Sequence, residues 1–125
     1  MKKLMVISIA TLLSACSMTA NNVAGTYQGT LPCSDCDKIE AKLVLKSDKS
    51  YIYETTYFQN KQPNEYLEKG QFEWDAKKED VIVLDEHAGN RKFKIRDNYV
   101  EMCDQDGNVA KTGLNYKLKK VQVKK

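Results

Sequence analysis

Apolar and polar side chains alternate along most of this chain, from about residue 23 onward. Alternation with a period of two is typical of half-buried β-strands, because successive side chains of a strand point to opposite faces. The clearest example is residues 39–46, where one face carries Ile39, Ala41, Leu43 and Leu45. The chain lacks a convincing stripe of apolar residues at helical spacing, so the pattern predicts an all-β protein.

Other segments rich in aromatic and β-branched residues predict further strands. These segments are Tyr51–Phe58, Gly70–Trp74, Val81–Leu84, Arg91–Ile95, Tyr99–Cys103 and Leu114–Leu118. Clusters of turn-forming residues separate them. The clusters predict a hairpin turn at Ser47–Ser50, a longer loop with Pro63 at Asn60–Asn64, and a tight turn at Asp104–Asn108.

Connections this short leave no room for crossover helices, so neighbouring strands should be antiparallel. About seven to nine such strands predict a small meander β-barrel, since closure removes exposed sheet edges. The opening Gly25-Thr26-Tyr27 is similar to the Gly-x-Trp opening of lipocalin strands, with Tyr in place of Trp. We therefore expect a lipocalin-like barrel over residues 23–121, followed by a basic tail at residues 122–125.

The first fifteen residues predict a targeting signal. Met1-Lys2-Lys3 is basic, and the apolar stretch Leu4–Leu13 is too short for the roughly 20 residues that span a bilayer. Leu13-Ser14-Ala15-Cys16 resembles the lipobox of bacterial lipoproteins. The resemblance implies cleavage of a signal peptide at residues 1–15, acylation of Cys16, and a short tether at residues 16–22 that keeps the domain near the lipid.

The residue after Cys16 bears on the destination of the protein. An Asp at this position is the usual signal for retention of such lipoproteins in the inner membrane, and this chain has Ser17 instead. The resemblance to lipoproteins therefore implies an outer-membrane anchor with the domain facing the periplasm.

Composition excludes several functions. The net charge is +3 over 125 residues, and basic residues alternate with acidic ones, which argues against a nucleic-acid partner. The single histidine, His87, makes a multi-histidine metal site impossible. It lies in a polar turn, where we expect it to be solvated.

The motif Cys33-Ser34-Asp35-Cys36 is the main candidate for chemistry. In an oxidising periplasm two cysteines at this spacing form a disulfide by default. When reduced, two soft thiolates suit Cu(I), which accepts few ligands. On chemistry alone, a plain loop disulfide that never meets metal and a Cu(I) chelate both remain open.

Two other functions of the motif fit less well. A thiol-disulfide enzyme needs a thiol with a lowered pKa, and the acids Asp35, Asp37 and Glu40 disfavour a thiolate. A zinc ribbon needs four ligands, usually from two cysteine pairs, and this chain has one pair.

Cys103 and Met102 are further candidate soft ligands, but adjacent strand residues face opposite sides, so at most one of them can face the motif. Cys103 is otherwise expected to be a small buried hydrophobe.

The segment Gly25–Cys36, with its Leu-Pro-Cys-x-x-Cys end, resembles the N-terminal domain of the copper resistance lipoprotein NlpE family. The strand Ala41–Leu45, the pattern Gly70-x-Phe72-x-Trp74 and the turn Asp104-x-Asp106-Gly107 extend the resemblance over nearly all of residues 23–120. The resemblance implies a β-barrel akin to lipocalins and carries Cys33 and Cys36 over as the family's motif cysteines.

The same resemblance implies a function. It indicates a non-enzymatic outer-membrane lipoprotein of the envelope-stress and copper-homeostasis class, signalling to a Cpx-type sensor. Longer family members carry a second, OB-fold domain, and we do not expect roles of that domain to transfer to these residues. The alternative is a lipocalin-like carrier, in which Leu43, Leu45 and Phe72 would bound a cavity for a small apolar ligand.

Overall fold

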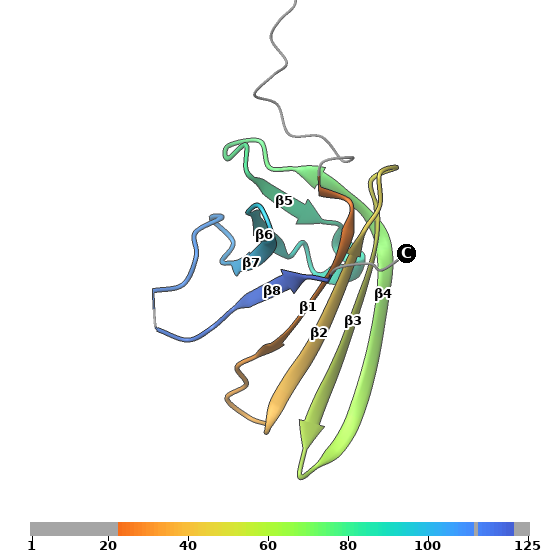
Figure 1. The fold of residues 1–125 in the computed structure, drawn as a ribbon, viewed down its shortest axis with the longest axis vertical. Coiled ribbons are helices and arrows are strands. Elements are labelled where there is room, and N and C mark those ends of the chain that lie inside the picture. The colour runs from red at the N-terminus through yellow and green to blue at the C-terminus, as the bar shows by residue number, and fades with distance from the viewer. Residues whose placement is uncertain (1–22, 112, 122–125) are drawn as a thin grey trace, which may run out of the picture.

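Eight antiparallel strands form a closed barrel in the computed structural model, which describes residues 23–111 and 113–121 (Figure 1). Each strand pairs with the next along the chain, and β8 returns to pair with β1. The strands are β1 (Gly25–Leu31), β2 (Lys38–Leu45), β3 (Ser50–Gln59), β4 (Gln62–Trp74), β5 (Val81–Leu84), β6 (Lys92–Ile95), β7 (Tyr99–Cys103) and β8 (Lys117–Lys120). The all-β meander barrel predicted from the sequence is confirmed.

The barrel is lopsided because its strands differ in length. β3 has 10 residues and β4 has 13, whereas β5 and β6 have 4 each. β4 pairs with β3 over ten residue pairs but with β5 only at Phe72, Glu73 and Trp74. The β3–β4 hairpin therefore extends well beyond the short strands, toward the same end as the loop between β1 and β2 (Figure 1).

The loop predicted at Asn60–Asn64 is wrong. Asn60 and Lys61 form a two-residue turn with φ of 53° and 67°, and β4 begins directly afterwards at Gln62. Positive φ at both central residues is the geometry of a tight hairpin turn. Pro63 fits inside β4 because it pairs with Phe58, and this second pair from the turn exchanges no hydrogen bonds, so the Pro63 nitrogen faces the open edge.

The last strand also differs from the prediction. The sequence predicts a strand over Leu114–Leu118, but β8 spans Lys117–Lys120. Its register is set by one inward residue, Leu118, which is fully buried and pairs with Val100 of β7. Leu114 stays 55% exposed.

The core fills the part of the barrel where all eight strands meet. Its largest fully buried side chains include Tyr27, Phe72 and Phe93, and Trp74 packs partly buried against this core. The hydroxyl of Tyr27 donates to the carbonyl of Val23 at 2.7 Å, which satisfies a polar group that would be costly to bury alone. In the described part of the chain, helices are too short to cross a membrane.

The carboxylate of Asp85 lies where β4 separates from the short strands. It accepts hydrogen bonds from the Tyr51 hydroxyl at 2.6 Å, the Gln71 amide at 2.8 Å and the His87 amide at 3.1 Å. Burial alone would raise the pKa of Asp85, but these donors outweigh it and hold the pKa below its ordinary value. The His87 side chain itself is exposed, in the short 3₁₀ helix η2 (Glu86–Ala88).

This junction predicts that Gly70 tolerates no side chain. A Cβ at Gly70 would lie 2.6 Å from Asp85 Oδ1, and the carboxylate cannot swing away without losing its donors. We expect Gly70→Ala to lower the free energy of unfolding by about 1–3 kcal/mol, as overpacking does elsewhere. Urea denaturation monitored by circular dichroism measures this change.

The matched control is the same substitution in an Asp85→Ala background. There the overlapping group is gone, so Gly70→Ala should cost much less. An equal cost in both backgrounds would show that the carboxylate is not the cause.

Candidate functional site

The Cys33–Cys36 motif forms the loop between β1 and β2. The two sulfurs are bonded at 2.05 Å with a Cα–Cα distance of 5.4 Å, so the disulfide predicted as the oxidised form is present. Both cysteines are half-buried, while Ser34 and Asp35 between them are exposed. The bond closes a four-residue loop, which should stabilise the fold by only about 2 kcal/mol.

Hydrogen bonds tie this loop to the tip of the β3–β4 hairpin. The Asp37 amide donates to the Phe58 carbonyl at 2.7 Å, and the Asp37 carboxylate accepts from the Lys61 amide at 2.9 Å. The Gln59 side-chain amide donates to the Asp35 carbonyl at 2.8 Å. The conformation of the disulfide loop is therefore coupled to the hairpin tip.

The surroundings of the motif do not favour a reactive thiolate. The loop joins two strands, so no helix N-terminus faces the cysteines. The nearest basic residue along the chain, Lys38, pairs with Glu40 at 3.1 Å and lies over the Phe58 ring at 5.0 Å from its centroid. Within residues 23–111 and 113–121, neither a helix N-terminus nor the Lys38 ammonium is placed to stabilise a thiolate at this motif.

Cys103 and Met102 lie on β7, away from the motif. The thiol of Cys103 is free, donates to the Glu101 carbonyl at 3.5 Å, and has a pKa raised by burial. Met102 packs partly buried against the core. Over residues 23–111 and 113–121, no three Cys, His, Asp or Glu side chains come together as a potential metal site, so Cys103 does not join Cys33 and Cys36.

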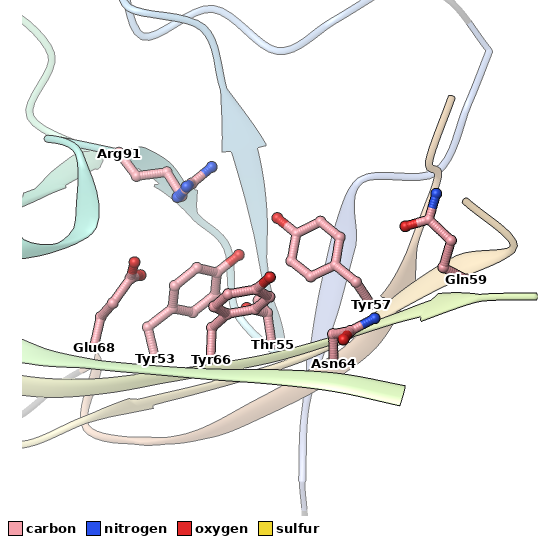
Figure 2. Close-up of a pocket in the computed structure, with 8 residues that line it drawn as sticks. All are labelled: Tyr53, Thr55, Tyr57, Gln59, Asn64, Tyr66, Glu68 and Arg91. Carbon is pink, nitrogen blue, oxygen red and sulfur yellow. The ribbon is translucent and has the colours of Figure 1, made fainter. Parts of the chain in front are cut away.

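A pocket of about 310 Å³ lies on the concave face of the extended hairpin (Figure 2). β3 and β4 supply one wall, and Arg91, from the loop before β6, faces it from across the barrel. The lining residues are Tyr53, Thr55, Tyr57, Gln59, Asn64, Tyr66, Glu68 and Arg91.

The pocket combines aromatic faces with a guanidinium whose Nε finds no hydrogen-bond partner among the described residues. The rings of Tyr57 and Tyr66 meet edge to face with centroids 5.4 Å apart. The Arg91 guanidinium lies 5.5 Å from the ring centroid of Tyr53, and its buried Nε has no hydrogen-bond partner within the described residues. Burial raises the pKa of Tyr53 to about 12, so its hydroxyl remains a neutral donor. Such a site suits a ligand with an apolar part and a hydrogen-bond acceptor.

The residues predicted to bound an apolar cavity pack in the core of the barrel instead. Leu43, Leu45 and Phe72 are at most 1% exposed and belong to the packed core. The pocket at the open end is lined by different, mostly polar residues.

Sequence reasoning missed this pocket. The signal available was the set of alternate residues on one face of β3, namely Tyr53, Thr55, Tyr57 and Gln59. Polar residues on one face of a strand normally indicate that this face is exposed to solvent. Arg91 lies 32 positions beyond Gln59 in the chain, so sequence spacing does not link it to this face. Only the closed barrel brings Arg91 opposite this face.

The chain is similar to known lipoproteins in sequence and in structure. It is 28% identical over 99 residues to lipoprotein NlpE of Escherichia coli K12, covering 78% of this chain and 41% of that protein. A crystal structure of a protein from Shewanella oneidensis described as a lipoprotein superposes with a TM-score of 0.72 and 31% identity, covering 83% of this chain and 96% of the other. The crystal structure of the Cpx pathway activator NlpE from Escherichia coli gives a TM-score of 0.59 and 27% identity, covering 80% of this chain and 52% of the other.

This chain spans about two fifths of the length of its curated Escherichia coli relative. The profile of the NlpE N-terminal domain matches residues 27–113, which include the disulfide loop and every pocket residue. The chain therefore belongs to the NlpE N-terminal domain family.

Proposed function

We propose that this protein is a lipid-anchored envelope-stress lipoprotein whose Cys33–Cys36 loop acts as a redox- and copper-responsive element. The observation that carries the proposal is the attachment of the disulfide loop to the hairpin tip through Asp35 and Asp37. A change in the sulfurs would alter a surface of the barrel rather than its buried core. This arrangement supports the proposal of a non-catalytic, signalling role.

The direction of β1 supports a periplasm-facing loop. The described chain enters the barrel at Val23, and β1 then runs from Gly25 to Leu31, directly before the motif. Seven strand residues span about 20 Å at roughly 3.3 Å each, so the motif lies at the opposite end from the attachment point of residues 16–22. With Cys16 acylated in the outer membrane, the loop would point away from the lipid.

The donor set fits Cu(I) and does not fit zinc. After a thiol reductant supplies two electrons and two protons to the disulfide, Cys33 and Cys36 present two thiols at the ends of one short loop. Cu(I) binding then displaces the thiol protons and needs only two sulfurs. Zinc needs four ligands, and the described residues gather no third one around the pair.

The similarity to the Cpx pathway activator of Escherichia coli supports a proposal for the signalling partner. We propose that this chain likewise acts on a Cpx-type envelope-stress sensor. The surface that would change is the disulfide loop together with the hairpin tip, since Gln59 and Lys61 hold the loop from that tip.

Lipid anchoring gives the first test. We expect radiolabelled palmitate to be incorporated into the protein, and Cys16→Ala to abolish this and release the protein from the membrane fraction. Ser17→Asp should move the protein to the inner membrane on density-gradient fractionation. Cys103→Ala is the matched control and should be labelled like the wild type, whereas labelling of Cys16→Ala would contradict the anchor.

Copper binding gives the second test. The reduced protein should bind about one Cu(I) in competition with a chromogenic chelator under anaerobic conditions, and the oxidised protein should bind none. Cys33→Ser or Cys36→Ser should abolish competitive binding, and Cys103→Ser should leave it unchanged. Binding that persists in the Cys33→Ser/Cys36→Ser double variant would disprove the copper site.

A further inference from the structure

β4 carries an open edge beside the pocket. Residues 62–71 of β4 pair with β3 on one side, while pairing with β5 on the other side starts only at Phe72. The edge is exposed: Tyr66 and Leu67 are each 56% accessible, although both are large and apolar. An open strand edge is a template for pairing with another chain.

The direction of each amide along this edge can be derived from two hydrogen bonds. The Phe72 amide donates to the Lys49 carbonyl at 2.8 Å, on the β3 side, and the Gln71 amide donates to Asp85 at 2.8 Å, on the other side. Amide directions alternate along a strand. The amides and carbonyls of Glu65, Leu67 and Lys69 therefore point outward.

Both ends of this edge are already protected. Pro63 has no amide hydrogen to offer, and the Gln71 amide is taken by the Asp85 carboxylate. In the described part of the chain, no strand pairs with the outer edge of Glu65–Lys69, so alternate main-chain donors and acceptors are open over these five residues. This length matches a short added strand.

The concave side of the same strand holds the pocket. Tyr66 and Glu68 line it from β4, and Arg91 faces them from the far side (Figure 2). A strand added to β4 would place alternate side chains on this concave face. The buried Nε of Arg91 lacks an acceptor, and among the described residues no ion pair joins Arg91 to Glu68. A carboxylate is the side chain that best satisfies an unpaired guanidinium.

We propose that Glu65–Lys69 of β4 binds an extended segment of a partner protein as an added β-strand, with an acidic side chain of that segment reaching Arg91. Main-chain hydrogen bonds would supply affinity, and the tyrosine-lined pocket would supply selectivity. This inference is independent of copper binding and of the lipid anchor.

A second copy of this chain fits the edge less well. Antiparallel pairing of two β4 strands around Leu67 would place Asn64 of one copy opposite Gly70 of the other. Asp85 already lies against Gly70 at that point, so the partner's hairpin tip would meet a covered edge. A separate extended segment can end before this obstacle.

The probe for the test is a heptapeptide of alternating threonine and valine with glutamate at its centre, blocked at both ends. We expect it to protect the amides of Glu65, Leu67 and Lys69 of the purified protein from hydrogen exchange by about tenfold or more at saturation. The amides of Asn64, Tyr66 and Glu68 bond to β3 already, so their exchange should change little. Exchange read by NMR resolves the two alternating sets.

Modified peptides separate strand addition from other binding. Residues whose side chains enter the pocket have amides that point away from β4, so N-methylation of the valines should be tolerated. N-methylation of the two central threonines, whose amides face β4, should abolish binding. A peptide with glutamine in place of glutamate should bind roughly tenfold more weakly.

Protein variants test the two halves of the site. Arg91→Gln should remove the preference for glutamate over glutamine, and Glu68→Gln, a matched variant in the same pocket, should strengthen glutamate binding. Leu67→Pro should abolish binding because it removes an outward amide, while Leu67→Ala should retain it. Circular dichroism confirms that each variant is folded.

Four results would overturn the proposal. The first is no saturable binding of the glutamate peptide, and the second is equal binding after N-methylation of the central threonines. The third is an unchanged preference for glutamate in Arg91→Gln. The fourth is protection of the outward amides that rises with protein concentration without peptide, which would assign the edge to a second copy.

Discussion

The open end of this barrel depends on a mismatch in strand length. β4 has 13 residues and β5 has 4, so β4 can satisfy its second edge over only three residue pairs. Buried main-chain amides need hydrogen-bond partners, and in a barrel the neighbouring strand supplies them. β4 has such a neighbour on its second edge only where it pairs with β5. At the point where pairing stops, the Asp85 carboxylate takes over the amide of Gln71. Beyond that point β4 pairs with β3 alone and forms the edge of a sheet that continues through β2 and β1 on the other side of β3.

The disulfide loop contacts the tip of the β3–β4 hairpin. Pairing of β2 with β3 ends at Phe58, so the turn at Asn60 and Lys61 projects beyond β2. The contacts of Asp37 with Phe58 and Lys61 therefore support the hairpin tip as much as the tip supports the loop. A disulfide worth about 2 kcal/mol is too weak to determine the stability of the whole barrel, but it is sufficient to bias a local contact of this size.

Features that depend on neighbouring residues in the chain were predicted well from the sequence. Contacts between residues far apart in the chain were not. The alternation around Leu43 and the spacing of Cys33 and Cys36 depend on neighbours in the chain, and both predictions are confirmed. The loop at Asn60–Asn64 was wrong because Pro63 normally interrupts a strand, whereas an edge position accepts it. The pocket could not be predicted because its key cation, Arg91, reaches the hairpin face only through the closure of β5 and β6 onto β7. Neither the position of Cys103 nor that of Met102 relative to the motif follows from sequence spacing.

One end of the barrel holds the packed core, and the other end presents an exposed surface suited to binding. The fully buried aromatic residues Tyr27 and Phe72 lie where the barrel is closed, while all of β4 from Gln62 to Leu67 is exposed. Exposed strand residues contribute little to the core, so selection for stability does not explain why Tyr66 and Leu67 are large and apolar at an open edge. Burial against another chain does explain it, because one added strand would cover both side chains and supply hydrogen-bond partners to the outward amides of β4. The part of the β3–β4 hairpin that extends beyond β5 is thus the part of the fold best suited to meet a partner.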